Sequence, residues 1–373
     1  MSFISKFIAT VMAMLMSLFG TLGMTGNVSD DYNEGKYKNV ILLIGDGMSF
    51  NTIAATEALT GVDLVMNDMP VLASSDIDSF MNTYTDSAAG GTALATGVRV
   101  INGTVGVYPF DLFSIDDINV PMNLCELAKA NGMAAGIVTT DQTSGATPSA
   151  FSAHTYARTN EGEICKDQLA SDLDLIWGGD TDSITKENAE SNGWTYIDNQ
   201  DDMFALTAGS RSIAQFNFDD LYNCTDEYNT PSIEEMTTKA IDILSADEDG
   251  FFLMVEGACI DKNAHNNVMD GVTECTVEFD KAVAAALEFA EKDGETLVIV
   301  TADHGTGGIT LNESTGEYYF TSGDHDRWDV PLFVSATDAG FTGGVLVKNR
   351  EIPVQIARVL GFGEDAFPAR KAK

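Results

Sequence analysis

The sequence predicts an α/β fold in which a central, mostly parallel β-sheet is sandwiched between helices. Short apolar runs rich in Val, Ile and Leu recur along the chain, and stretches with helical periodicity separate them. Strands that are apolar along their whole length are typical of parallel sheets, which are buried on both faces. The chain has 373 residues, enough for one large domain or two of ordinary size.

Six apolar runs are predicted to be strands, and three longer stretches are predicted to be helices. The last helical stretch has apolar residues such as Val283, Leu287 and Ala290 at intervals of four and three, and it ends at an Asp-Gly pair. The strands are expected within residues 38–47, 132–141, 172–179, 250–257, 295–305 and 330–336. The helices are expected within residues 121–132, 232–250 and 272–294.

Residues 1–26 are predicted to be a secretory signal peptide. Lys6 precedes a long apolar run, residues 7–24, and small and polar residues follow it. A basic start, an apolar centre and a polar exit are typical of such signals. The alternative is an uncleaved membrane anchor, because the run approaches the roughly 18 residues that span a bilayer. We expect export to the periplasm or the extracellular medium, with no stable membrane span after cleavage.

The chain is strongly acidic. It has 20 Lys and Arg residues against 57 Asp and Glu residues, which gives a formal net charge of −37 at pH 7. Nucleic-acid binding needs clustered Lys and Arg, so this composition argues against a nucleic-acid partner and against adhesion to anionic lipid. The acidic residues are spread along the chain, which favours a solvated surface for most of them.

Residues 35–373 are expected to form a single domain. The polar, irregular stretch at about residues 161–229 is interpreted as a cap or an insertion within it. The five cysteines include no C-x-x-C pair, so they indicate neither a zinc knuckle nor a thioredoxin-like site. In an exported protein some of them could pair, for example Cys165 with Cys224, and buried free thiols are the alternative.

Two carboxylates stand where predicted strands end. Open α/β sheets place their chemistry outside the carboxyl ends of the strands. Asp46 lies between two glycines at the end of the first strand, where ordinary turn chemistry is the alternative interpretation. Glu256 ends the fourth strand, and a carboxylate beside an apolar strand is unfavourable unless it is paired or binds a metal.

Three of the four histidines lie close in sequence to carboxylates, in segments that follow or precede predicted strands. Asp261 and His265 are spaced i, i+4 and share one face of a helical turn, as two ligands of one ion would, or as a solvated pair would. Asp303 and His304 are adjacent at the end of the fifth strand, and His325 lies shortly before the sixth. Imidazole with carboxylate suits zinc better than magnesium, and sites that share carboxylates suit two-metal phosphoryl transfer.

Ser87 permits two interpretations. It opens a predicted helix of small residues, "DSAAGGTALATG", and Ser, Thr and Asp are common helix N-caps. A hydroxyl at this position also faces the positive end of the helix dipole, and a nearby zinc ion would make it a nucleophile. The local sequence favours the cap, and the metal ligands at the other strand exits favour the nucleophile. His154, the fourth histidine, is expected on a helix and is interpreted as structural.

Five motifs together resemble the alkaline phosphatase family. They are "ILLIGDGM", "YTDSAAGGTALATG", "TTDQTSGATPSAFSAHTYAR", "VEGACIDKNAHNN" and "VTADHGTGG", and they occur in the family's order between about Val40 and Pro331. The resemblance implies a central sheet flanked by helices and a homodimer. It also implies that the chain hydrolyses small-molecule phosphate monoesters through a phosphoserine intermediate.

The resemblance also implies a role for each matching residue. Ser87 would become phosphorylated, and the planar guanidinium of Arg158 would hold two phosphate oxygens. The expected ligand sets are Asp261, His265 and His325 for one Zn²⁺, Asp46, Asp303 and His304 for a second Zn²⁺, and Asp46, Thr147 and Glu256 for one Mg²⁺.

This sequence departs from the family pattern at two of these places. Many relatives have Asp or His before the "ATP" of the third motif, where this chain has Gly145. A side chain that contacts the third metal site directly or through water is therefore missing, so that ion is expected to bind more weakly or to differ in identity. Asp141, four residues away, could compensate. His325 is followed by Asp-Arg, where the family typically has Thr-Gly.

Two other functions remain as alternatives. The first is a related hydrolase of the same superfamily, such as a phosphodiesterase or a sulfatase. The sulfatase signature, Cys or Ser followed by x-Pro-x-Arg, is absent at Ser87, and Arg158 favours a monoester, whose terminal oxygens need a bidentate partner. The second is a non-catalytic, acidic, metal-binding secreted protein, which only the charge supports.

Overall fold

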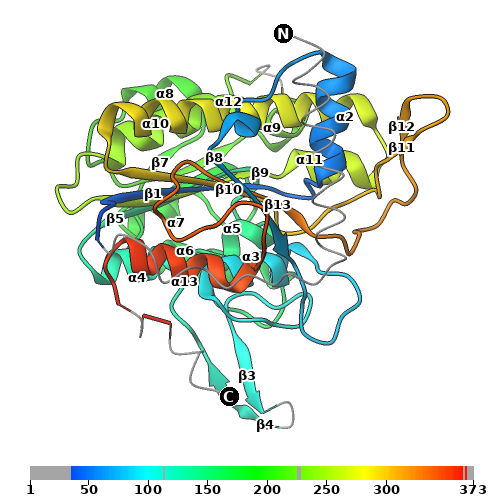
Figure 1. Cartoon of the computed structure of the whole chain (residues 1–373). Coiled ribbons are helices and arrows are strands. Elements are labelled where there is room, and N and C mark those ends of the chain that lie inside the picture. Colours follow the sequence, from blue (N-terminus) through cyan, green and yellow to red (C-terminus); the bar gives the residue numbers. More distant parts are fainter. Residues whose placement is uncertain (1–34, 112–113, 225–227, 364–365, 368–373) are drawn as a thin grey trace.

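A computed structural model describes residues 35–111, 114–224, 228–363 and 366–367 (Figure 1). The predicted signal peptide, residues 1–26, lies outside these ranges, so export and cleavage stay predictions. Within the ranges, no helix combines the length and the apolar character needed to cross a membrane.

In the described part of the chain, ten strands form one large sheet in the order β14-β2-β13-β10-β1-β9-β5-β6-β8-β7. β13 runs antiparallel to both of its neighbours, and the other pairs are parallel. The prediction of a mostly parallel sheet is therefore confirmed. In sheet order the strands are β14 (Leu346–Lys348), β2 (Val71–Asp76), β13 (Val330–Val334), β10 (Thr296–Thr301), β1 (Asn39–Gly45), β9 (Phe251–Gly257), β5 (Ala134–Gln142), β6 (Leu175–Gly179), β8 (Ser212–Phe216) and β7 (Thr195–Ile197).

Helices cover both faces of this sheet (Figure 1). Ile41 and Leu43 of β1 belong to the hydrophobic core on one face, and Val40 and Leu42 belong to the core on the other. All four side chains are fully buried, which is why the strand is apolar throughout. The helices above the sheet in the figure are α2 (Phe50–Thr60), α8 (Gln200–Ala205), α9 (Phe218–Asn223), α10 (Ile233–Leu244), α11 (Cys259–His265) and α12 (Met269–Asp293). Those below it are α3 (Ser87–Thr96), α4 (Leu124–Ala130), α5 (Ala146–Ala150), α6 (Glu161–Ala170), α7 (Lys186–Ser191) and α13 (Ile352–Val359).

The smaller elements lie outside the main sheet. Two β-hairpins and two short 3₁₀ helices complete the described elements, and one hairpin projects from the lower helical layer in Figure 1. The elements are that hairpin, β3 (Tyr108–Asp111) and β4 (Ser114–Asn119), the second hairpin, β11 (Thr310–Asn312) and β12 (Glu317–Tyr319), and the 3₁₀ helices η1 (Val65–Asp68) and η2 (Asn349–Glu351).

The six predicted strands correspond to β1, β5, β6, β9, β10 and β13, and the three predicted helices correspond to α4, α10 and α12. Local signals set their ends. Ser232 caps α10, and the backbone N–H of Ser232 in turn donates to Glu235, which makes a reciprocal capping box. Gly294 ends α12 in the left-handed conformation, with a φ angle of 73°.

Residues 161–229, the stretch interpreted as a cap or an insertion, contribute strands to the main sheet. This stretch supplies β6, β8 and β7, which extend one side of the main sheet. β6 and β8 are buried along their whole length, whereas only the last residue of β7 is buried. The three strands are only three to five residues long, and polar helices separate them, so the segment as a whole has a polar composition. Inside it, the indole N–H of Trp177 donates to Ser212 Oγ at 3.0 Å, which joins β6 to β8.

The suggested pairing of Cys165 with Cys224 is also wrong. All five cysteines are free thiols in this structure. The Sγ atom of Cys165 lies 3.8 Å from Thr181 Oγ1, whereas the Sγ atom of Cys224 lies 3.8 Å from that of Cys275. The two cysteines belong to different parts of the fold, and sequence spacing alone could not show this.

Candidate active site

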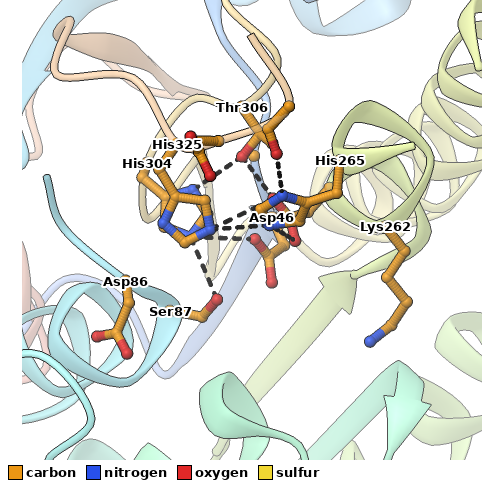
Figure 2. Close-up of polar contacts among 12 residues, drawn as sticks. Asp46, Asp86, Ser87, Lys262, His265, His304, Thr306 and His325 are labelled. Atoms are coloured by element: carbon orange, nitrogen blue, oxygen red, sulfur yellow. Dashed lines mark hydrogen bonds and ion pairs between the residues drawn. The ribbon is translucent and has the colours of Figure 1, made fainter. Parts of the chain in front are cut away.

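The candidate active site lies at the carboxyl ends of three neighbouring strands. β10, β1 and β9 are parallel and adjacent, so the residues that follow them meet at one edge of the sheet. Asp46 follows β1, Asp303 follows β10, and Glu256 is the last but one residue of β9. α11 begins directly after β9 and carries Asp261 and His265, and Figure 2 shows His265 beside Thr306 and Asp46 at the same place.

Asp261, His265 and His325 form the first cluster of potential metal ligands. The Nε2 atoms of the two histidines lie 3.1 Å apart, and His265 Nε2 lies 3.3 Å from Asp261 Oδ2. Each histidine also places its Nδ1 atom 2.7 Å from a backbone carbonyl, that of Gly323 for His265 and that of Thr85 for His325. Such bonds fix the orientation of a ring and point its other nitrogen at a metal.

Asp46, Asp303 and His304 form the second cluster, and all three are buried. His304 Nε2 lies 3.3 Å from Asp303 Oδ2 and 3.5 Å from Asp46 Oδ1. The rings of His304 and His325 stack with their centroids 3.7 Å apart, so the two clusters are in direct contact. The sequence-predicted ligands of both expected zinc sites are therefore brought together.

The carboxylates of this region are buried close to one another. Burial, followed by the charges of neighbouring carboxylates, raises the pKa values of Asp46 and Asp303 well above their usual range. Burial and the charge of Asp141 raise the pKa of Glu256 to about 7. So much negative charge away from water is unfavourable unless cations stabilise it.

Four buried polar atoms in the same region lack a hydrogen-bond partner among the described residues. A buried polar atom without a partner is costly, and oxygen atoms of this kind are suitable ligands for a divalent cation. The atoms are Asp46 Oδ1, Thr147 Oγ1, Glu256 Oε1 and Asp303 Oδ2. They include one atom of every residue expected at the third metal site, so the donor set fits the cations that the sequence predicted.

Ser87 is the first residue of α3 but not its N-cap. Asp86 is the N-cap, and its Oδ1 atom accepts a hydrogen bond of 3.0 Å from the backbone N–H of Ala89. The capping interpretation of Ser87 is therefore wrong. The hydroxyl oxygen of Ser87 lies 3.2 Å from His304 Nε2. α3 can approach the second cluster closely because Gly90 has no side chain. A Cβ atom at this position would lie only 2.8 Å from the carbonyl oxygen of Asp303.

Arg158 contacts Asp86, the residue that precedes Ser87 in the sequence. Its Nη1 atom is 3.3 Å from Asp86 Oδ2, and its backbone N–H donates to the carbonyl of Gly103. Over a third of the Arg158 side chain is exposed, so the guanidinium can reach a ligand from solvent. Asp86 thus caps the helix with one carboxylate oxygen and contacts Arg158 with the other.

Sequence reasoning missed the roles of Asp86, Lys262 and Thr306. The hydroxyl of Thr306 donates to Asp261 Oδ1 and lies 3.3 Å from His304 Nδ1, so it connects the two clusters (Figure 2). All three residues stand within two positions of a predicted site residue. That proximity was the available signal, but it does not show which side chains point into the site.

Asp141 occupies the space next to Gly145. A Cβ atom on Gly145 would overlap Oδ2 of Asp141, so a larger side chain cannot stand at position 145 while Asp141 keeps this conformation. The other oxygen of Asp141 lies 2.9 Å from Lys262 Nζ. A carboxylate is therefore present beside this part of the site, although it comes from a different position than the family pattern implies.

His154 lies outside the site, as the sequence predicted. Its Nε2 atom is 2.8 Å from Glu126 Oε1, and its Nδ1 atom is 2.7 Å from the carbonyl oxygen of Gly106. It follows α5 rather than lying in a helix, so that detail of the prediction is wrong.

Comparison with known proteins adds independent information. A model of the alkaline phosphatase family matches residues 37–176 and 176–337. Alkaline phosphatase 3 of Bacillus subtilis is 32% identical over 300 residues, a match that covers 75% of this chain and 63% of that protein. Alkaline phosphatase of Escherichia coli is 32% identical over 348 residues, covering 75% of this chain and 72% of that protein. This chain thus spans slightly under two thirds of the Bacillus relative.

The fold is also similar to solved structures. The alkaline phosphatase from the Antarctic bacterium TAB5 superposes with a TM-score of 0.75 and 30% sequence identity, covering 88% of this chain and 99% of that one. A variant of the TAB5 protein was solved with Mg bound in its M3 site, and it superposes with a TM-score of 0.73 at the same identity and coverage.

Proposed function

Because this chain belongs to the alkaline phosphatase family, we propose that it hydrolyses phosphate monoesters through a phosphoserine intermediate on Ser87. The observation that carries this proposal is the position of the Ser87 hydroxyl, 3.2 Å from His304 in the second cluster and at the start of α3. A nucleophile at a helix N-terminus gains favourable interactions with backbone N–H groups and with the helix dipole.

We propose that the site binds two Zn²⁺ and one Mg²⁺. Asp261, His265 and His325 would hold one zinc ion, and Asp46, Asp303 and His304 would hold the other, because mixed nitrogen and oxygen donors suit zinc. Oxygen donors alone suit Mg²⁺, which supports a third site at Asp46, Thr147 and Glu256. When bound, such cations offset the negative charge on the attacking and leaving oxygens of phosphoryl transfer.

The residues of the chain then divide the remaining work. Ser87 loses its proton to solvent, its oxygen bonds to phosphorus, and the ester oxygen leaves with the electron pair of its bond. Arg158 binds two oxygens of the phosphoryl group through its planar fork, and Asp86 holds the guanidinium beside Ser87. Water then attacks phosphorus, the bond to Ser87 Oγ breaks, and inorganic phosphate leaves as the serine regains a proton.

The substrate class follows from Arg158. A monoester has three terminal oxygens, so two can bind the guanidinium while the third oxygen and the second negative charge are left for the bound cations, whereas a diester has only two terminal oxygens and one negative charge. Small phosphate monoesters are therefore the proposed substrates, and a phosphodiesterase is the second candidate. Homodimer formation and export are further expectations from the family resemblance and the N-terminal sequence.

Comparing p-nitrophenyl phosphate with bis-p-nitrophenyl phosphate tests this proposal. We expect the value of kcat/KM for the monoester to exceed that for the diester by roughly 100-fold or more. Higher activity on the diester would favour the phosphodiesterase, and no hydrolysis of either compound by the zinc- and magnesium-loaded protein would favour a non-catalytic metal-binding protein.

A further inference from the structure

Three of the five cysteines line a cavity that contains none of the candidate metal ligands. The cavity has a volume of about 610 Å³, and Cys224, Cys259 and Cys275 contribute to its wall together with Phe279 of α12. The thiols come from three different elements: Cys224 ends α9, Cys259 begins α11, and Cys275 lies in the second turn of α12. The fold therefore gathers thiols that are well separated in the sequence.

Cys224 and Cys275 are in direct contact across this wall. Their Sγ atoms lie 3.8 Å apart, and the two residues are 51 positions apart in the chain. A disulfide bond is about 2 Å long, so the sulfur atoms need to approach by roughly 2 Å, which is within the range of side-chain rotation. Cys224 has a φ angle of 52°, a conformation in which it closes the C-terminal end of α9.

The two thiols differ in a way that assigns their chemical roles. Cys224 is exposed, whereas Cys275 is buried. Their mutual hydrogen bond lowers the pKa of Cys224 and raises the pKa of Cys275. Cys224 is therefore the accessible thiol that more readily becomes a thiolate, and Cys275 is the thiol that can react with it afterwards.

The other three cysteines are in less reactive positions. Cys125 and Cys165 are buried in the core on the opposite face of the sheet, and burial raises the pKa of both, that of Cys165 to about 11. Cys259 is 2% exposed, and its thiol lies 3.4 Å from the carbonyl oxygen of Leu221. None of these three combines exposure with a second thiol in the way that Cys224 does.

We propose that Cys224 and Cys275 form a disulfide bond when the folded chain meets a small-molecule disulfide such as oxidised glutathione. The Cys224 thiolate attacks one sulfur of the oxidant and releases one molecule of reduced thiol. Cys275 then loses its proton and attacks the Cys224 sulfur of the mixed disulfide, which releases the second molecule. The two cysteines lose two electrons in total, and the oxidant gains them. The new bond joins the end of α9 to α12.

Counting free thiols tests this proposal without measuring phosphatase activity. The full chain is reduced, freed of reductant, incubated with oxidised glutathione, and then denatured and labelled with N-ethylmaleimide. Because the chain has five cysteines, we expect five labels before oxidation and three afterwards. Mass spectrometry of the unreduced digest should find a peptide pair that joins Cys224 to Cys275.

Serine variants give the matched controls. Cys224→Ser and Cys275→Ser should each abolish the cross-linked peptide pair, whereas Cys165→Ser should retain it. The wild-type measurement decides the proposal even if a variant fails to fold. Five labels after oxidation, a bond to another cysteine, or a bond between two chains would overturn it.

Discussion

The Nζ atom of Lys262 lies 2.9 Å from Oδ1 of Asp141, while the other oxygen of the same carboxylate fills the space beside Gly145. Burial lowers the pKa of Lys262, but the charge of Asp141 and the hydrogen bond to Asp141 raise it by more. The net pKa is above the usual value, so the lysine stays protonated. The side chain that Gly145 lacks is therefore replaced in space by a carboxylate from four residues earlier in the chain.

Removing the charge of Asp141 should weaken the proposed Mg²⁺ site. In Asp141→Asn, Lys262 loses its ion-pair partner. Asp46 and Glu256, whose charges also raise the pKa of Lys262, are then the carboxylates that attract its ammonium group. The ammonium group then competes with Mg²⁺ for the same oxygens. We expect the dissociation constant of Mg²⁺ to rise roughly tenfold, measured by the metal content after dialysis at fixed free Mg²⁺.

Two further variants separate this effect from a general loss of charge. Glu288→Gln removes an exposed partner of Lys292 and should leave Mg²⁺ binding unchanged. The double variant Asp141→Ala with Gly145→Asp returns a carboxylate to the same space and should restore part of the affinity. Unchanged Mg²⁺ affinity in Asp141→Asn would contradict the role of the ion pair.

Replacing the proposed nucleophile should stop catalysis without unfolding the protein. Ser87→Ala removes the hydroxyl, but Asp86 supplies the N-cap of α3, so the helix keeps its capping bond. We expect kcat to fall by roughly 1,000-fold or more. The phosphoenzyme trapped by acid quenching should disappear, while the melting temperature changes little. Ser191→Ala, at an exposed site on α7, is the control, and a phosphoenzyme that persists in Ser87→Ala would rule out this nucleophile.

Two variants of Asp86 should separate its capping of α3 from its contact with Arg158. Asn caps helices about as well as Asp, so Asp86→Asn should keep the stability of α3 but lose the charge that faces Arg158. We expect KM for p-nitrophenyl phosphate to rise roughly fivefold with little change in melting temperature. Asp86→Ala should show the same change in KM and also destabilise the protein by about 1 kcal/mol. A KM that changes only in the alanine variant would assign Asp86 to capping alone.

Removing metal ions should abolish activity. Asp46, Asp303 and Glu256 are buried, and their pKa values are raised, so without cations their ionised forms are unfavourable. We expect EDTA to remove activity and to lower the melting temperature, and zinc with magnesium to restore both. Elemental analysis of the purified protein should find about three ions per chain. Unchanged turnover in a fully metal-stripped preparation would refute the proposed mechanism.

The raised pKa of Asp280, a residue of α12 outside the candidate active site, should make the stability of the protein depend on pH. Asp280 accepts hydrogen bonds from the backbone N–H groups of Val65 and Met66, and burial raises its pKa to about 6. The folded state therefore binds a proton more tightly than the unfolded state, whose pKa is near 3.8. Its contribution to stability is greatest below pH 4 and is lost as the pH rises through 6.

Denaturant unfolding at pH 4.5 and pH 7 measures this contribution. The wild type should gain stability relative to Asp280→Asn as the pH falls, by at most about 3 kcal/mol, because the asparagine does not titrate. A difference in stability that is the same at both pH values would show that Asp280 keeps an ordinary pKa in the folded protein.

Much of the fold and of the site could be predicted because the signals are local. β1 and β10 are continuous apolar runs, and Asp46 and Asp303 stand directly after them. Parallel strands expose their carboxyl ends on one edge of a sheet, so such residues can be expected to meet. The short strands β7 and β8 gave no comparable signal, because a few apolar residues between polar helices resemble a loop-rich insertion.

By itself, the sequence determined the α/β class, the strands at the centre of the sheet and the residue types that could bind metal ions. Each of these depends on short-range patterns of apolar, acidic and histidine residues. Only the tertiary structure decided that Asp86 rather than Ser87 caps α3, that Asp141 pairs with Lys262, and that Cys224 meets Cys275. These outcomes depend on backbone direction and on the order of strands and helices in space, which bring together side chains that no sequence spacing relates.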